Sequence, residues 1–180
     1  MDQSVNSNFS IVEIKPSQFN SIEGLIRESQ LIDDLLSINQ AIGFIKNKLD
    51  RNKVKIFACQ NEVNNYMAFV VLVAKINPYS FVKYNWHISY LYVKNEFRRQ
   101  KMAYRLMQKT IEYACFTNVE LLSLNTGVDN LSAQNLYQSL HFERKYFLSN
   151  YYYYELNISD LKNRIKKRET LKNLSFGIEN

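Results

Sequence analysis

The feature that most constrains this chain is a strand-like segment that runs into a helix-like segment through a short basic loop. Residues 87–93 are rich in aromatic and β-branched side chains, which predicts a strand. After the basic loop at 98–103, apolar residues recur at helical spacing through 103–114 and predict a helix with one apolar face. Such a loop gathers unpaired backbone N–H groups, the positive end of a helix and arginine side chains. The segment therefore predicts a phosphate-binding site.

The rest of the chain predicts a mixed α/β fold. Helical patterns also cover 17–30, 32–52 and 131–140. The segments with strand patterns are 10–15, 54–59, 66–76, 83–93, 119–125, 142–147 and 151–156. Strands that come first in a meander and then alternate with helices predict a mixed sheet covered on both faces.

Length and charge suit one folded domain followed by a basic tail. The chain has 180 residues, 46% of them hydrophobic, which is enough for a real core. We expect the domain over 1–157 and a basic helical tail over 158–180. The net charge of +6 indicates an anionic ligand or partner. The tail itself has two readings. It binds nucleic acid or an acidic protein, or it is a solvated helix docked by the apolar residues Leu161, Ile165, Leu171 and Leu174.

Neither a metal site nor a membrane segment is expected. Cys59 and Cys115 have no metal-ligand spacing, and each lies in an apolar run, so we expect buried, unreactive thiols. The first eight residues are polar, and no apolar run approaches the roughly 20 residues that a membrane helix needs. These features predict a cytoplasmic protein.

Two motifs resemble those of the GNAT superfamily, the acyl-CoA-dependent N-acetyltransferases. The family's acetyl-CoA loop has Gln or Arg, two residues, Gly, one residue, then Gly or Ala, and 98–103 follows it except at the first glycine. The second motif spans 130–142 and resembles the family's asparagine, alanine, leucine-tyrosine and glycine-phenylalanine series. Lys101 and His141 stand where the family usually has glycine. The resemblance covers nearly all of the chain to about Leu156.

The resemblance implies a GNAT-like fold whose mostly antiparallel central sheet has splayed middle strands. It also implies acetyl-CoA as co-substrate, with its pyrophosphate on the loop's N–H groups. The expected cofactor-binding loop residues are Arg98, Arg99, Gln100, Lys101, Met102 and Ala103. Lys101 pairs with phosphate or hinders its approach, and both readings stay open.

Further cofactor contacts are implied by the family's splayed strand. Leu91 and Val93 match positions whose free backbone groups hold the pantetheine arm, and the N–H near Leu91 suits an oxyanion donor. Asn130 either hydrogen-bonds the pantetheine arm, caps the short helix that follows, or does both.

The resemblance also implies two catalytic residues. Tyr137 matches the family's tyrosine near the departing sulfur, where a phenol can protonate the thiolate, although core packing is the alternative. His87 matches a position where some members carry a catalytic glutamate, and a pKa near ~6.5 suits a base at neutral pH. A structural histidine beside Trp86 is the equal alternative. Ser89 is a weaker candidate, for holding a relay water.

The expected activity is direct acetyl transfer from acetyl-CoA to a primary amine. In this family the first two helices and the loop between the third and fourth strands wall the acceptor pocket. Carboxylates and aromatic rings there suit a cationic amine, and the favoured alternative is that the acids are solvated helix-face and capping residues. The matching residues are Glu23, Glu28, Asp33, Asp34, Pro78, Tyr79, Phe81, Tyr84 and Trp86. A small amine or amino-sugar is preferred to a protein amino group. The alternatives are a non-catalytic acyl-CoA-binding module and a toxin that acetylates aminoacyl-tRNA. A homodimer is left open.

Overall fold

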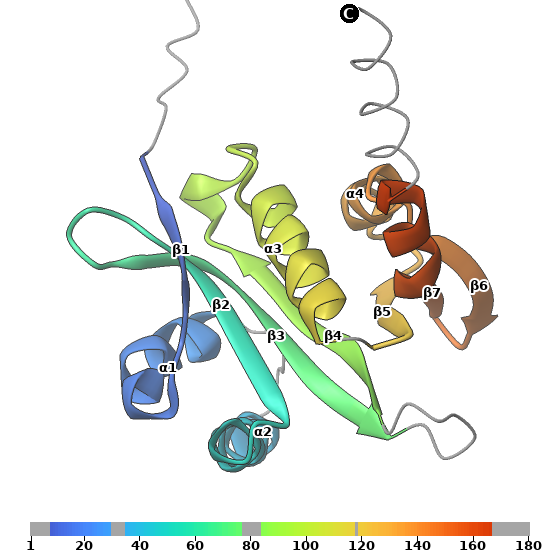
Figure 1. Cartoon of the computed structure of the whole chain (residues 1–180). Coiled ribbons are helices and arrows are strands. Elements are labelled where there is room, and N and C mark those ends of the chain that lie inside the picture. Colours follow the sequence, from blue (N-terminus) through green and yellow to red (C-terminus); the bar gives the residue numbers. More distant parts are fainter. Residues whose placement is uncertain (1–7, 30–34, 77–83, 118, 167–180) are drawn as a thin grey trace, which may run out of the picture. The chain divides into compact units, whose positions relative to one another are not determined.

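The computed structural model describes residues 8–29, 35–76, 84–117 and 119–166 (Figure 1). Its strands form one sheet in the order β1-β2-β3-β4-β5-β7-β6. The pairs β1–β2, β2–β3, β5–β7 and β6–β7 are antiparallel. The strands are β1 (Ser10–Glu13), β2 (Val54–Gln60), β3 (Tyr66–Ile76), β4 (Tyr84–Val93), β5 (Leu121–Gly127), β6 (Glu143–Leu148) and β7 (Tyr151–Asn157). The expected mixed α/β fold with a mostly antiparallel sheet is confirmed.

The α-helices lie in the segments where the periodicity predicts them, whereas the 3₁₀ turn at residues 95–97 was not predicted. They are η1 (Pro16–Gln18), α1 (Phe19–Glu28), α2 (Leu35–Asp50), η2 (Asn95–Phe97), α3 (Met102–Phe116) and α4 (Leu131–Ser139). The helix expected from Ser17 starts instead as a 3₁₀ turn with Pro16 at its first position, and α1 proper begins at Phe19. Proline fits there because the first turn of a helix does not use its N–H.

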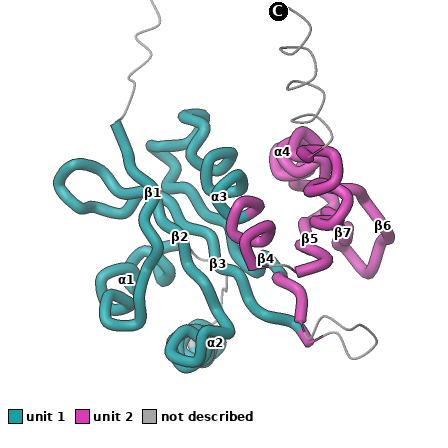
Figure 2. The backbone as a smooth tube through the Cα atoms, viewed as in Figure 1, with its two compact units in different colours: residues 1–75, 87–110 teal, residues 76–86, 111–180 magenta. Residues whose placement is uncertain are grey.

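The chain divides into two compact units, residues 1–75 with 87–110 and residues 76–86 with 111–180 (Figure 2). In the first unit, the apolar stripes of α1 and α2 pack on one face of β2 and β3. The buried residues of this cluster include Phe19, Ile22, Ile26, Ile42, Ile45, Ile56, Phe69 and Val71. Each such side chain contributes roughly 2 kcal/mol of burial free energy, so this face is held firmly.

In the second unit, α4 and one face of β7 share a core. Leu124 of β5 pairs with Tyr154 of β7, which is fully buried. The Tyr137 ring of α4 lies 6.0 Å from the Tyr154 ring and 6.1 Å from the Phe142 ring. These tilted aromatic contacts fix the orientation of Tyr137.

The predicted basic tail begins as a helix over residues 158–166. Ile158 is buried, and its N–H donates to the Glu120 carbonyl at 2.8 Å. Leu161 is partly buried and Ile165 is 45% exposed, so both readings of the tail stay predictions. The tail residues from 167 onward, including Leu171 and Leu174, lie outside the described residues.

Candidate functional site

The basic loop is anchored to the end of β4 by its own side chains. Arg98 donates from Nε to the Val93 carbonyl at 3.2 Å. Gln100 donates from Nε2 to the Glu96 carbonyl at 3.4 Å. The 3₁₀ turn η2 lies between β4 and the loop. It is closed by the Phe97 N–H, which donates to the Lys94 carbonyl at 3.0 Å. Two of the expected cofactor residues therefore also hold the shape of the loop.

The loop adopts the backbone that glycine would normally supply. Arg99 has φ 61° and Lys101 has φ 62°, both in the left-handed region. A side chain in this region costs roughly 1–2 kcal/mol, yet each residue keeps its backbone N–H. Both side chains are exposed to solvent. The departure from the family motif at Lys101 is therefore absorbed by backbone strain, and the loop keeps its turn.

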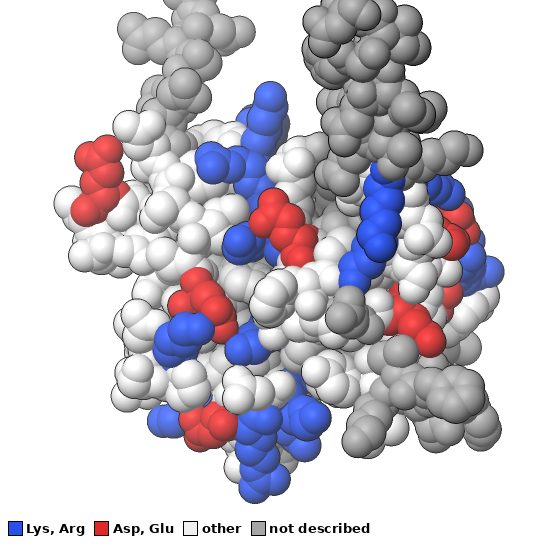
Figure 3. Space-filling model, in the orientation of Figure 1, with Lys and Arg blue, Asp and Glu red and all other residues white. Residues whose placement is uncertain are grey.

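The N-terminus of α3 follows the loop directly. The first backbone hydrogen bond of the helix runs from the Arg105 N–H to the Lys101 carbonyl, at 2.9 Å. The N–H groups of Met102 and Ala103 precede it and have no partner within the helix. Lys and Arg side chains gather over this end of α3 and over α2 (Figure 3). Backbone donors and positive charge together make this end of the helix suited to an anion.

The C-terminal half of β4 approaches this loop with two alternating faces. Tyr90 and Tyr92 pack against the α1–α2 cluster. Because strand side chains alternate, Leu91 and Val93 lie on the opposite face. Both are only partly buried, and Ser89 is exposed.

His87, also on β4, has a different protonation behaviour from the one expected. It is 6% exposed, and burial followed by the charge of Lys75 lowers its pKa to about 4. The sequence-based expectation of a pKa near ~6.5 is therefore wrong, because it assumes a solvated imidazole. His87 is neutral at pH 7 and is a weak proton acceptor.

Tyr137 of the second unit is held as a neutral phenol. Burial, followed by the charge of Tyr154, raises its pKa to about 12, and the side chain is 6% exposed. Its position on α4 is fixed by the ring contacts described above and by the Phe142 N–H, which donates to the Tyr137 carbonyl at 3.0 Å. The hydroxyl therefore carries its proton at neutral pH.

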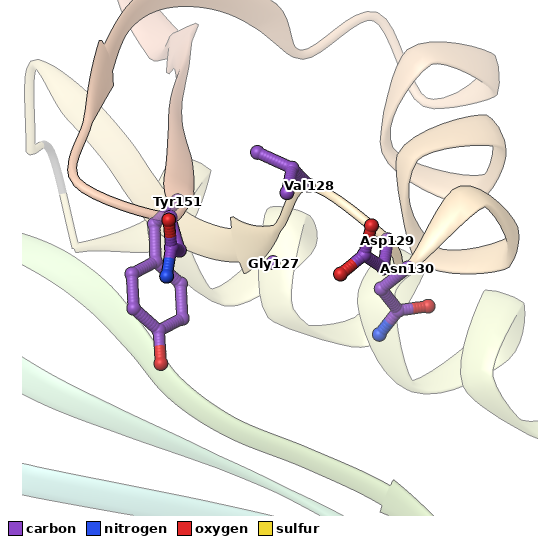
Figure 4. Close-up of a pocket in the computed structure, with 6 residues that line it drawn as sticks. Gly127, Val128, Asp129, Asn130 and Tyr151 are labelled. Carbon is purple, nitrogen blue, oxygen red and sulfur yellow. The ribbon is translucent and has the colours of Figure 1, made fainter.

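Asn130 caps α4, as one of its expected roles requires. Its Oδ1 accepts the Ala133 N–H at 3.1 Å. Asn130 also lines a cavity of about 540 Å³, together with Asp129, Tyr151 and other residues (Figure 4). Figure 4 shows Asp129 and Asn130 at the start of α4, with Tyr151 across from them.

A buried glutamine that the sequence reasoning did not single out fixes this turn. Gln134 is 6% exposed, and its Nε2 donates to the carbonyls of Gly127 at 3.2 Å and Val128 at 2.8 Å. Its Oε1 accepts from Arg144 at 3.2 Å. The signal was present in the second motif, where a glutamine follows the alanine, but periodicity alone does not distinguish a buried glutamine from an exposed one.

The residues expected to wall the acceptor pocket divide into three groups. Asp33, Asp34, Pro78, Tyr79 and Phe81 lie outside the described residues. Glu23 and Glu28 form ion pairs, with Arg27 at 2.7 Å and Lys94 at 3.0 Å. Trp86 is buried, and its Nε1 donates to Thr117 Oγ1 at 3.0 Å, so its indole serves the core. Tyr84 packs edge-on against Trp86 with ring centroids 5.5 Å apart.

The two thiols are unreactive in character. Cys59 is buried, and burial raises its pKa to about 12. Cys115 is partly buried, and burial also raises its pKa.

Across the described ranges, no three His, Cys, Asp or Glu side chains gather as a metal site. In the same part of the chain, no helix has the length and apolar character to span a membrane.

The mixed sheet, with a strand that leads through a basic loop into a helix, has the arrangement that the two sequence motifs predict for the GNAT family. The chain belongs to the acetyltransferase (GNAT) family, whose model matches residues 26–142. No curated protein matches the sequence.

Solved structures share this fold at low identity. An N-acetyltransferase from Staphylococcus aureus Mu50 is 19% identical, covers 84% of this chain and 99% of its own, and has a TM-score of 0.69. Mutant spermidine/spermine N-acetyltransferase SpeG from Vibrio cholerae is 16% identical, with coverages of 88% and 98% and a TM-score of 0.64. The PaiA N-acetyltransferase from Thermoplasma acidophilum, in complex with coenzyme A, is 14% identical, with coverages of 83% and 99% and a TM-score of 0.63.

Proposed function

We propose that this protein is an N-acetyltransferase that moves the acetyl group of acetyl-CoA directly to a primary amine of a small molecule. One observation carries the proposal: the loop before α3 keeps left-handed backbone at Arg99 and Lys101 although it has no glycine. Strained backbone of this kind often occurs at ligand-binding sites, and here the two strained residues directly precede the free N–H groups of α3. The strain is consistent with a retained pyrophosphate cradle.

Known relatives support both substrates. A structural neighbour is solved with coenzyme A, and other neighbours are spermidine N-acetyltransferases. In the proposed complex, the N–H groups at the start of α3 hold the pyrophosphate, and Arg99 and Lys101 add charge. The backbone of Leu91 and Val93 and the amide of Asn130 hold the pantetheine arm.

The proposed reaction needs one proton to leave the amine and one to reach the sulfur. The neutral amine nitrogen attacks the thioester carbonyl carbon, and the developing oxyanion accepts the N–H near Leu91. As the C–S bond breaks, the Tyr137 hydroxyl protonates the sulfur and is then reprotonated from solvent. His87 is the candidate acceptor of the amine proton. With a pKa of about 4 it is a weak base, so we assign it to hydrogen-bonding the attacking amine while solvent carries the proton away.

The test is release of free thiol from acetyl-CoA over a panel of primary amines, with mass spectrometry of the product. Thiol release that depends on the amine and yields the acetylated amine supports the proposal. A thermal shift on adding acetyl-CoA, without turnover on any amine, contradicts it. That outcome favours a non-catalytic acyl-CoA-binding module, the reading that the low pKa of His87 also supports.

A further inference from the structure

One face of β7 carries a row of side chains that the reaction scheme above does not use. Tyr151, Tyr153 and Glu155 alternate along the strand and therefore share a face. Their cross-strand partners on β5 and β6 belong to the same unit. These partners are Gly127 and Leu148 for Tyr151, Asn125 and Tyr146 for Tyr153, and Ser123 and Glu143 for Glu155. We call this set the β7 face.

A polar network fixes the carboxylate of the β7 face. Burial raises the pKa of Tyr153; its hydroxyl is also hydrogen-bonded to Ser123, which lowers that pKa, and to Glu155, which raises it. The phenol thus donates to the carboxylate and accepts from the serine hydroxyl. Ser123 is 5% exposed, so the base of the network is buried. A carboxylate accepts about four hydrogen bonds, so Glu155 has capacity for a further donor.

Aromatic rings stand beside this carboxylate. The Tyr146 ring stacks on the Tyr153 ring with centroids 4.6 Å apart and planes 15° from parallel. Tyr146 is 53% exposed and Tyr151 56% exposed, so both present ring surface to solvent. Tyrosine faces beside a carboxylate attract organic cations, because the ring quadrupole and the charge act together.

Of the two acids on the β7 face, Glu155 is the one available to bind an organic cation. Lys145 also lies within the field of Glu155, but its ammonium is bound to Glu143 at 2.6 Å. The acids first expected to attract an amine, Glu23 and Glu28, hold Arg27 and Lys94 instead. Arg164 also acts on Glu143, so the cations near this face are drawn to Glu143, and Glu155 is the carboxylate left to accept the ammonium of a ligand.

We propose that the β7 face binds the acceptor amine in its ammonium form, with Glu155 accepting its N–H donors and Tyr146 and Tyr153 contacting its aliphatic stem; the nitrogen then gives one proton to solvent before it attacks as the neutral amine. The description of this amine as the acceptor rests on the proposed acetyltransferase function. The binding itself does not depend on turnover. The substrate class is then a primary amine that is cationic at neutral pH and has an apolar stem.

The test compares butylamine, which is charged at pH 7, with 1-butanol, its uncharged analogue, by saturation-transfer NMR on the full chain without acetyl-CoA. Wild type is expected to bind butylammonium at least tenfold more tightly than butanol. Glu155→Gln is expected to lose that preference. The Glu143→Gln/Lys145→Gln double variant is the matched control, because it removes the ion pair across the strand without freeing an ammonium beside Glu155, and it should bind as wild type does.

If Glu155→Gln folds poorly, a second variant still tests the proposal. Tyr146→Ala changes an exposed ring and should weaken butylammonium binding several-fold with an unchanged melting temperature. Equal binding of butylammonium by wild type and Glu155→Gln overturns the proposal. A dimer that covers the β7 face also overturns the proposal. In that case wild type is dimeric and binds no butylammonium, and Tyr146→Ala is monomeric.

Failure of the proposed function gives a different result. Butylammonium binding that depends on Glu155, in a wild-type protein that releases no thiol with any amine, overturns acetyl transfer and leaves the cation site standing. In an active enzyme, Glu155→Gln should raise the KM for the amine about tenfold and leave the KM for acetyl-CoA unchanged. A changed KM for acetyl-CoA alone contradicts the assignment.

Discussion

Lys101 and His141 share an unusual backbone conformation, with φ values of 62° and 66°. They are also the two positions at which the family's motifs have glycine. The chain has therefore replaced both glycines without giving up the left-handed turns that they form. The cost is strain of roughly 1–2 kcal/mol at each position, which glycine would remove.

Lys101→Gly should stabilise the protein by about 1 kcal/mol, because glycine relieves the strain but adds freedom to the unfolded chain. Chemical denaturation measures the change. His141→Gly is the matched control for strain outside the loop and should give a similar gain.

Lys101→Ala separates charge from strain, because it removes the ammonium and keeps the β-carbon. Because Lys101 is proposed to pair with phosphate, both Lys101 variants should bind coenzyme A several-fold more weakly. Tighter binding by both would mean that the lysine hinders the phosphate.

Tyr137→Phe should lower kcat by roughly 10²-fold, because it removes the proton donor. It should leave the melting temperature nearly unchanged, since the ring contacts with Phe142 and Tyr154 remain. Tyr154→Phe is the matched control in the same cluster: it loses the hydrogen bond from Arg144 at 3.2 Å but no catalytic hydroxyl. A Tyr137→Phe enzyme with wild-type kcat would assign Tyr137 to the core alone.

Thr110→Val should stabilise the protein by about 1 kcal/mol, because a buried hydroxyl without a partner is replaced by a methyl group. Thr110 of α3 is fully buried, and within the described chain its Oγ1 has no hydrogen-bond partner. Thr117→Val is the opposite case, since Thr117 Oγ1 accepts from Trp86, and it should destabilise by about 1 kcal/mol. Thermal denaturation of the pair checks both signs. A destabilised Thr110→Val would show that the hydroxyl has a partner.

His87 should make the protein less stable as the pH falls from 6.5 to about 4. Its folded-state pKa is about 4, against 6.5 for the free group, so within this window the unfolded chain takes up a proton that the folded chain does not. Stability is therefore full above pH 6.5 and lost on acidification, by at most roughly 3 kcal/mol. His87→Gln should show a flatter dependence in urea melts at pH 7, 5.5 and 4.5. An unchanged slope would contradict the burial of a neutral imidazole.

Periodicity predicted the elements well because most of them bury one clear face. The strand Tyr66–Ile76 and the end of the loop helix at Phe116 were predicted at their observed bounds. The loop could be recognised because its arginines, Ala103 and the following helix are adjacent in sequence. Its left-handed turns at Arg99 and Lys101 could not be predicted from residue types, since neither residue favours that region.

The less predictable features depend on contacts between distant residues. The pKa of His87 is set by burial and by Lys75 on another strand. Glu23 and Glu28 form ion pairs with Arg27 and Lys94, respectively. Arg27 lies one helical turn from Glu23, whereas Lys94 is far from Glu28 in the sequence. The β7 face arises from the register of three strands, which brings Ser123 and Tyr146 beside residues near the end of the domain. Sequence spacing contains none of this information.

The central claim is that the glycine-free loop before α3 holds the pyrophosphate of coenzyme A. The most direct test is isothermal titration of the full chain with coenzyme A and with pantetheine, which has the same arm but lacks the pyrophosphate and the 3′-phosphoadenosine attached to it. The account predicts binding of coenzyme A that weakens at high salt, and loss of at least 100-fold in affinity for pantetheine. Equal affinity for the two ligands, or no binding of coenzyme A, would contradict it.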